Sequence, residues 1–138
     1  MLQVEINYWA VLVAAVVNFA LGAVWYSPAL FGKRWLAIIN KSEAELEEMK
    51  KGATRGYVLS VVGALVMSFV LAHIVDYGQA TTIASGMQSG VWLWLGFVAT
   101  TNLSSVLFEA RPTGLYLISM GYYLVSLLIM GAILAIWT

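Results

Sequence analysis

The sequence predicts an all-α fold, a polytopic membrane bundle of four transmembrane helices in a single domain, and two observations support this prediction. Of the 138 residues, 62% are hydrophobic and only 10% are charged, a balance that is unusual for a soluble globular domain. The apolar residues also form four long segments, each close to the roughly 20 residues that a helix needs to cross a bilayer. Because lipid cannot hydrogen-bond to the backbone, and because no segment alternates like a barrel strand, all four are expected to be helices.

The four segments follow one another along the chain, at residues 6–26, 56–75, 86–108 and 114–137. The loop 27–55 contains six of the seven basic residues, and the seventh, Arg111, lies between the third and fourth segments. Loops rich in Lys and Arg stay in the cytoplasm. This distribution predicts a multi-pass protein of the inner (plasma) membrane, with a cytoplasmic loop 27–55 and both termini outside.

The cytoplasmic loop is expected to contain a short amphipathic helix. Ser42 followed by Glu45 three residues later is the pattern of a capping box at a helix start, and Gly52 suits a helix end. Three apolar side chains fall on one side of such a helix, at Leu46, Met49 and Ala53. The helix would rest on the membrane surface or on a neighbour, either as a plain connector or as a docking element for a partner.

Small residues recur at helical spacing in every span, which is the pattern of closely packed membrane helices. A bundle of four crossings does not require so many close contacts, so their number favours self-association into a homo-oligomer. The stripes are Ala14, Asn18 and Gly22; Ser60, Ala64 and Ser68; Gly86 and Gly90; and Gly131 and Ala135.

The most distinctive stretch lies where the first span meets the loop. Pro28 disfavours helix at the preceding residue, Gly32 permits a turn and Lys33 can reach lipid phosphates, so an interfacial helix end is expected there. Aromatic rings would fix the depth of this end in the bilayer. The residues of this interfacial motif are Trp25, Tyr26, Ser27, Pro28, Phe31, Gly32, Lys33 and Trp35.

With this motif, written WYSP-x-x-FGK-x-W, the chain resembles a family of small bacterial four-helix integral membrane proteins that is catalogued only as a domain of unknown function. The resemblance spans nearly the whole chain and is supported more weakly by Phe108-Glu109-x-Arg111 and Gly121-Tyr122-Tyr123. It implies the same topology of four spans. It implies no activity and no catalytic residue.

Polar side chains within the spans form a candidate functional layer, because such residues are costly in lipid and tend to face protein or water. Asn18 and Asn102 are expected at nearly equal depth, where they could hydrogen-bond if adjacent. The layer would be either interhelical glue or the lining of a pocket or pore, with Glu109 as a cation or proton site or simply paired with Arg111. Its members are Asn18, Asn102, Ser105, Glu109 and Tyr123.

Other kinds of site have little support in the sequence. His73 and Asp76 share a helix face near the outer end of the second span, but no Ser or Cys nucleophile stands at a matching spacing. There is no Gly-rich phosphate loop or cluster of metal ligands, and seven basic residues balance seven acidic ones, unlike in a nucleic-acid-binding protein. We therefore expect no catalytic residue, no cofactor, no metal site and no nucleic-acid partner.

The expected function is structural or accessory, in a homo-oligomer whose surfaces bind further copies, other membrane proteins or lipid. The alternative is a small oligomeric channel or transporter for an ion or small solute. Four short spans cannot easily enclose a solute path alone, so this alternative requires assembly.

Overall fold

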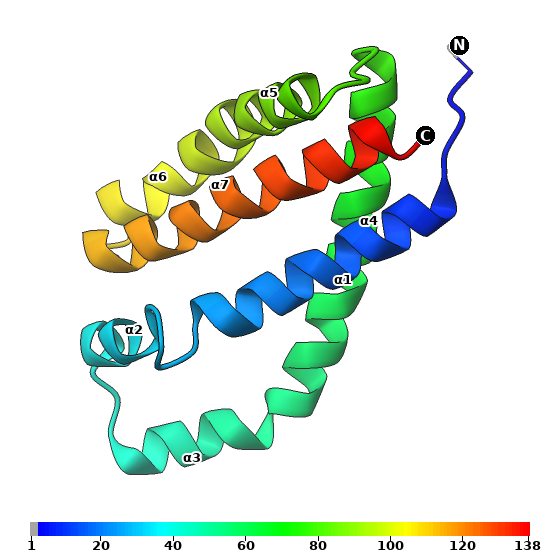
Figure 1. Ribbon diagram of the computed structural model, residues 1–138. Helices are drawn as coiled ribbons and strands as arrows, with labels where there is room; N and C mark the ends of the chain where they lie inside the picture. The colour runs from blue at the N-terminus through cyan, green and yellow to red at the C-terminus, as the bar shows by residue number, and fades with distance from the viewer. Residues whose placement is uncertain (1–2) are drawn as a thin grey trace.

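In a computed structural model of the chain, which describes residues 3–138, every regular element is a helix. Four helices are long and apolar enough to cross a membrane, which confirms the predicted all-α fold of four spans (Figure 1). Their bounds lie close to those of the predicted segments. The spans are α1 (Tyr8–Trp25), α4 (Ala53–Tyr77), the continuous stretch Ile83–Leu107 and α7 (Thr113–Ile136).

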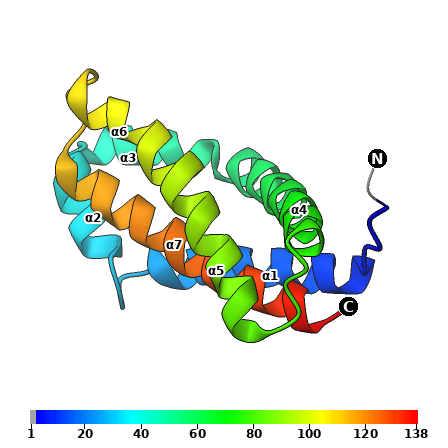
Figure 2. The same ribbon diagram turned by 90° about the horizontal axis from the view of Figure 1, so that it is seen from above.

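Helix α7 lies at the centre of the bundle. Helix α5 (Ile83–Leu93) packs along one side of α7 and α1 packs along another, while α4 crosses behind them (Figures 1 and 2). The start of α1, the end of α7 and the turn between α4 and α5 lie together, at what we call the terminal end. The opposite end, which we call the loop end, holds α2 (Gly32–Ile39), α3 (Glu43–Lys51) and the turn before α7.

The third span is not one regular helix. A π-helical segment, η1 (Trp94–Ala99), separates α5 from α6 (Thr100–Leu107). Helix α7 holds both ends of this segment: Trp94 Nε1 donates to the Met120 carbonyl at 2.8 Å, and the Tyr116 hydroxyl donates to the Ala99 carbonyl at 2.6 Å. Such segments break the regular backbone pairing, so contacts from a neighbouring helix help to stabilise them. The apolar pattern of residues 86–108 predicted a continuous span and gave no sign of this irregularity.

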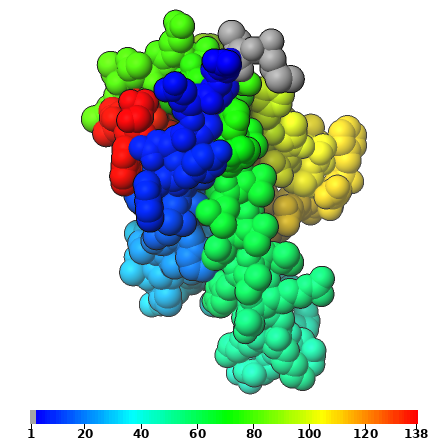
Figure 3. Space-filling model, turned by 90° about the vertical axis from the view of Figure 1, so that its right-hand side faces the viewer, coloured from blue at the N-terminus to red at the C-terminus, as the bar shows by residue number. Residues whose placement is uncertain are grey.

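The loop 27–55 forms two short helices instead of the one that was predicted. Ser42 begins α3 as expected, since its Oγ accepts a hydrogen bond from the Glu45 amide at 3.2 Å, and α3 ends before Gly52. The unpredicted helix, α2, begins at the buried Gly32, where a Cβ would lie 2.7 Å from the Ser27 carbonyl oxygen. Only glycine fits this turn. Helix α3 buries none of its residues and projects from the loop end (Figure 3).

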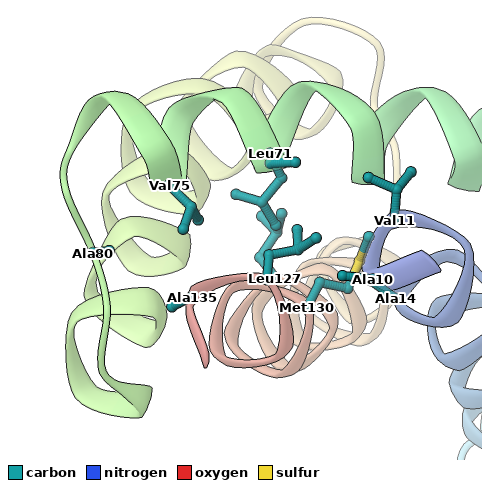
Figure 4. Close-up of a cluster of buried hydrophobic side chains, with 11 residues drawn as sticks. Ala10, Val11, Ala14, Leu71, Val75, Ala80, Leu127, Met130 and Ala135 are labelled. Atoms are coloured by element: carbon teal, nitrogen blue, oxygen red, sulfur yellow. The ribbon is translucent and has the colours of Figure 1, made fainter. Parts of the chain in front are cut away.

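The hydrophobic core joins α1, α4 and α7 (Figure 4). Leu71 of α4 and Met130 of α7 meet there with at most 1% of their surfaces exposed. A buried hydrogen bond lies beside them, from Ser68 Oγ of α4 to the Val11 carbonyl of α1 at 2.8 Å. Helices in lipid gain no hydrophobic driving force from meeting, so close van der Waals packing and such hydrogen bonds stabilise the bundle.

Most members of the small-residue stripes are used within the chain, although Ser60 of α4 is exposed. Gly86 and Gly90 of α5 lie directly against the backbone of α7, and a Cβ at Gly90 would be 2.5 Å from the Leu127 carbonyl oxygen. Gly131 of α7 faces Gly86 across the same seam, and Ala14 of α1 is completely buried. Because a single chain satisfies these contacts, the stripes alone no longer call for a second copy, and the homo-oligomer stays a prediction.

Candidate functional site

A cleft opens at the loop end because α4 diverges from α1 and α7 (Figure 1). Along the first half of α4, from Tyr57 to Val66, the large apolar side chains are exposed. Two cavities of about 470 Å³ and about 790 Å³ occupy the space between the helices. Both are lined by Tyr26, Tyr57 and Ser60, so they adjoin. We call the smaller one the deep cavity, the larger one the mouth cavity, and the two together the cleft.

The deep cavity lies between α1, α4 and α7, and its walls are aromatic, small and polar. Its volume falls in the range of about 300 to 1,000 Å³ that is typical of small-molecule pockets. None of the lining residues carries a charge. They are Asn18, Phe19, Gly22, Ala23, Tyr26, Tyr57, Ser60, Ala64, Tyr122 and Tyr123.

Asn18 is the most deeply buried polar side chain in this wall, with 5% of its surface exposed. Its side-chain carbonyl lies 2.6 Å from the Tyr122 hydroxyl and 2.5 Å from the Ser126 hydroxyl. The Tyr122 hydroxyl also lies 3.0 Å from the Asn18 backbone carbonyl, so its single proton is shared between the two Asn18 oxygens. The Asn18 amide nitrogen Nδ2 donates to no atom of residues 3–138. Within that same part of the chain no side-chain polar atom is both fully buried and unpaired, so Nδ2 is reached from the cavity that Asn18 lines.

Tyr123 provides a second unused donor. It lines the same cavity, and its hydroxyl has no hydrogen-bond partner in the described part of the chain. Nearby, the Tyr26 hydroxyl reaches Ser119 Oγ over 3.4 Å, a long bond, and the rings of Tyr26 and Tyr122 meet edge to face with their centroids 5.8 Å apart. The deep cavity therefore presents hydrogen-bond donors beside aromatic surfaces.

The interfacial motif forms the turn from α1 to α2 and one wall of the mouth cavity. Trp25 fixes the turn to α7, because its indole nitrogen donates to the Ile118 carbonyl at 3.0 Å. Within the turn, the Phe31 amide donates to the Trp25 carbonyl at 3.0 Å, and the Gly32 amide donates to the Ser27 carbonyl at 2.9 Å. The motif residues that line the mouth cavity are Tyr26, Pro28, Gly32, Lys33 and Trp35.

Lys33 is the one charged residue among those that line the two cavities of the cleft. Its neighbour Arg34 instead lines a separate hollow of about 170 Å³ with Trp25. The ion pairs found among residues 3–138 belong to α3 and its flank, and they join Lys41 to Glu45, Lys50 to Glu47 and Lys51 to Glu48. The cleft is thus neutral in its depth and has one positive charge at its mouth.

The members of the predicted polar layer lie in two places. Asn18 and Tyr123 line the deep cavity, whereas Asn102 and Ser105 lie on α6 and do not reach it. Asn102 Nδ2 donates to the Val98 carbonyl at 2.8 Å, and Ser105 Oγ donates to the Asn102 carbonyl at 2.7 Å. Each of these two side chains therefore donates a hydrogen bond to a backbone carbonyl of its own span. Asn18 and Asn102 therefore do not pair.

The charged residues after α6 do not form the expected pair either. Glu109 and Arg111 are both exposed, and no ion pair joins them in the described part of the chain. Instead, Ala110 adopts the left-handed conformation, with φ of 54°, and the Arg111 amide donates to the Ser105 carbonyl at 3.1 Å. This backbone bond caps the end of α6 without help from either charge.

Two residues of α7 hydrogen-bond to Asn18; Tyr122 was noted from the sequence but not placed among the site residues, and Ser126, which is buried behind the cleft wall, was not noted. They sit four residues apart on α7, a spacing that places both on one face toward Asn18. A search for polar pairs at this spacing in the fourth span would have found them. Nothing in the sequence indicates that their common partner lies more than a hundred positions earlier.

A packed layer separates the cleft from a pocket of about 70 Å³ at the terminal end, whose lining includes Glu5 and Asp76. Helices α1, α4 and α7 contribute to both sides of this layer: on α1, Ala10 lines the terminal pocket and Asn18 lines the cleft. The residues between them are at most 3% exposed, which leaves no open path. We call them the plug layer: Ala14, Ser68, Leu71, Leu127 and Met130.

The His73 and Asp76 pair is not formed. His73 Nδ1 lies 2.8 Å from the Phe69 carbonyl on the preceding turn, and its ring packs edge to face on that of Phe69. Asp76 is exposed. Among residues 3–138, no three His, Cys, Asp or Glu side chains gather closely enough to hold a metal ion.

A family model described as "Protein of unknown function (DUF1761)" matches residues 9–135. The match confirms the resemblance to a family of unknown function that the sequence suggested. No curated protein and no solved structure matches the chain.

Proposed function

The chain belongs to the DUF1761 family of proteins of unknown function, and from this premise we propose that it is an accessory protein of the bacterial inner membrane that acts by binding. The bound molecule is a lipid-soluble, amphipathic ligand, and the cleft is its site. The observation that supports this proposal is the pair of unused hydrogen-bond donors, Asn18 Nδ2 and the Tyr123 hydroxyl, in the wall of the deep cavity.

A polar group that faces lipid without a partner is costly, so membrane proteins usually turn such groups toward protein, water or ligand. Asn18 lies within α1 and Tyr123 within α7, both well inside their spans. Residues 3–138 supply no acceptor to these two donors. A ligand that brings acceptors into the deep cavity would remove this cost on binding.

The position of the cleft suits a ligand that arrives through the bilayer. The exposed first half of α4 leaves the cleft open at its side, along the depth of the membrane. With the basic loop in the cytoplasm and both termini outside, the cleft opens toward the cytoplasmic leaflet. Lys33 and Trp35 at its mouth then lie at the membrane surface, where a Lys and a Trp can contact lipid headgroups.

A cavity-filling variant tests the proposal. Ser60 lines both cavities of the cleft, so Ser60→Phe places a ring where the ligand would lie. Val62 is 50% exposed on the same helix and lines neither cavity, which makes Val62→Phe the matched control. Native mass spectrometry of protein extracted in a mild detergent should find a bound small molecule on the wild type and on Val62→Phe but not on Ser60→Phe. If the wild type carries no bound molecule, or if both variants retain the molecule equally, the binding function is refuted.

The homo-oligomer remains part of the proposal. Since most members of the small-residue stripes are occupied within the chain, copies would meet mainly through exposed apolar faces, such as that of α4. Light scattering of the purified protein in detergent measures its mass against the 15.1 kDa of one chain. A monomer mass would remove the oligomer and leave the binding function intact.

A transporter is the second candidate, and one observation favours it: the cleft and the terminal pocket lie on opposite sides of the plug layer between the same three helices. Rearrangement of that layer would open the cleft to the other side. Purified protein in liposomes, loaded with a potassium-sensitive or pH-sensitive dye, would then show flux that Ser60→Phe abolishes and Val62→Phe preserves. Absence of flux for both potassium ions and protons would leave binding as the function.

A further inference from the structure

We propose that the ligand of the deep cavity is a neutral, planar ring that bears carbonyl groups and an apolar tail, the chemistry of a membrane quinone. This inference rests on the proposed binding function and specifies its ligand. Asn18 Nδ2 and the Tyr123 hydroxyl would donate to the ring carbonyls. The apolar tail would leave through the open side of the cleft into the bilayer.

The charge of the cavity points to a neutral ligand. Among residues 3–138, no charged residue lines the deep cavity, and the one cation of the cleft, Lys33, lines only the mouth cavity. An ionised group placed at the depth of Asn18 would have no counter-ion there, and burying an unpaired charge is far more costly than burying a neutral polar group. The deep cavity is therefore unsuited to a phosphate or carboxylate.

The hydrogen-bonding pattern points to a ligand that accepts. The acceptor of the Asn18 amide, Oδ1, is already taken by two hydroxyls of α7, so the free atom of this side chain is the donor Nδ2. The Tyr123 hydroxyl has a proton to donate and no acceptor among the described residues. A carbonyl oxygen is a strong acceptor without a net charge, whereas a plain acyl chain would leave both donors unpaired.

The shape of the wall points to a ring. The rings of Phe19 and Tyr57 meet edge to face with centroids 6.2 Å apart, and those of Tyr26 and Tyr122 also meet edge to face, with centroids 5.8 Å apart. All four rings line the deep cavity. Flat aromatic walls favour a planar ligand, because ring-to-ring contacts add to the burial of apolar area.

Fluorescence quenching tests the inference, since quinones quench tryptophan emission and Trp25 packs against Tyr122 of the cavity wall, with ring centroids 6.4 Å apart. The probe is decylubiquinone, added to purified protein in nanodiscs of phosphatidylcholine. The matched ligand is decylbenzene, which has the same tail and a ring without carbonyls. We expect saturable quenching by decylubiquinone that decylbenzene does not displace.

Two variants and one control locate the site. Tyr123→Phe removes one hydroxyl that bonds no other residue described, so the fold should be kept, and Asn18→Leu removes the other donor. Loss of one hydrogen bond worth about 1 kcal/mol corresponds to about fivefold weaker binding. Asn102→Leu makes the same change of side chain outside the cleft, on α6, and should bind as the wild type does.

The outcomes separate this inference from the proposed function. Displacement of decylubiquinone by decylbenzene, or equal affinities of the wild type and Tyr123→Phe, would overturn the quinone ligand, even where native mass spectrometry still finds another molecule in the cleft. If Asn18→Leu does not fold, Tyr123→Phe alone decides between these results. A protein that quenches only in proportion to added quinone, with no saturation, would likewise refute the inference.

Discussion

Replacement of Gly90 by alanine should loosen the seam between α5 and α7. A Cβ at this position would lie 2.5 Å from the Leu127 carbonyl oxygen and 2.8 Å from the carbonyl carbon, whereas ordinary contact begins at 3.4 Å. The two helices would have to separate by roughly 0.9 Å, the difference between 3.4 and 2.5 Å, because the obstructing atoms belong to the backbone and no side chain can turn away. Overpacking of this kind typically costs about 1 to 3 kcal/mol.

Gly63 of α4 provides the control, because a Cβ there would meet no atom within 4 Å. Both positions lie inside helices, where alanine is favoured over glycine by up to about 1 kcal/mol. This gain is common to the two variants and cancels when they are compared. The expected difference in their free energies of unfolding is therefore the repulsion at Gly90 alone, about 1 to 3 kcal/mol.

Titration of the protein with sodium dodecyl sulfate in mild detergent micelles, followed by circular dichroism, measures this difference. Gly90→Ala should unfold at a lower fraction of the denaturing detergent than the wild type, and Gly63→Ala at an equal or higher one. Equal midpoints for the two alanine variants would mean that α5 and α7 do not approach as closely as the seam requires. The bundle would then be held together by other contacts.

Three further outcomes are expected. A double-mutant cycle of Asn18→Leu and Ser126→Ala, followed by the same titration, measures the coupling energy of the two side chains. We expect about 0.6 kcal/mol and no more than about 1.7 kcal/mol, the range for hydrogen bonds between membrane helices. A coupling energy of zero would contradict the 2.5 Å hydrogen bond. Ser42→Ala should remove about 1 kcal/mol from α3 and speed amide exchange there, yet leave the unfolding of the bundle unchanged because α3 buries nothing. In whole cells, a membrane-impermeant maleimide should label Thr81→Cys and spare Ser42→Cys, and the reverse pattern would invert the orientation.

The fold followed from the sequence to the extent that it depends on local properties. Each span was located correctly because the cost of placing a segment in lipid is summed over its own residues. The start of α3 at Ser42 and its end at Gly52 were likewise correct, since a cap involves only neighbours along the chain. The helix α2 was missed because its start depends on Gly32 fitting against the end of α1, a contact within a folded turn.

The candidate site was harder to foresee. Asn18 and Tyr123 were chosen for their polarity in a span and do meet in one cavity, but Asn102 and Ser105 were chosen by the same reasoning and lie elsewhere. A polar side chain on a membrane helix can bond to its own backbone or to another helix. Its position in the sequence does not distinguish these cases, because both satisfy the group equally well.

By itself, the sequence determined that the chain forms four apolar helical spans, roughly where each lies along the chain, and which small residues are available for close contact. Only the tertiary structure decided the divergence of α4, the pairing of Asn18 with Ser126 and the closure of the plug layer. The reason is physical. Burial in lipid is a sum over neighbouring residues, whereas the rotation and crossing angle of each helix are set by short-range packing between segments that are far apart in the chain.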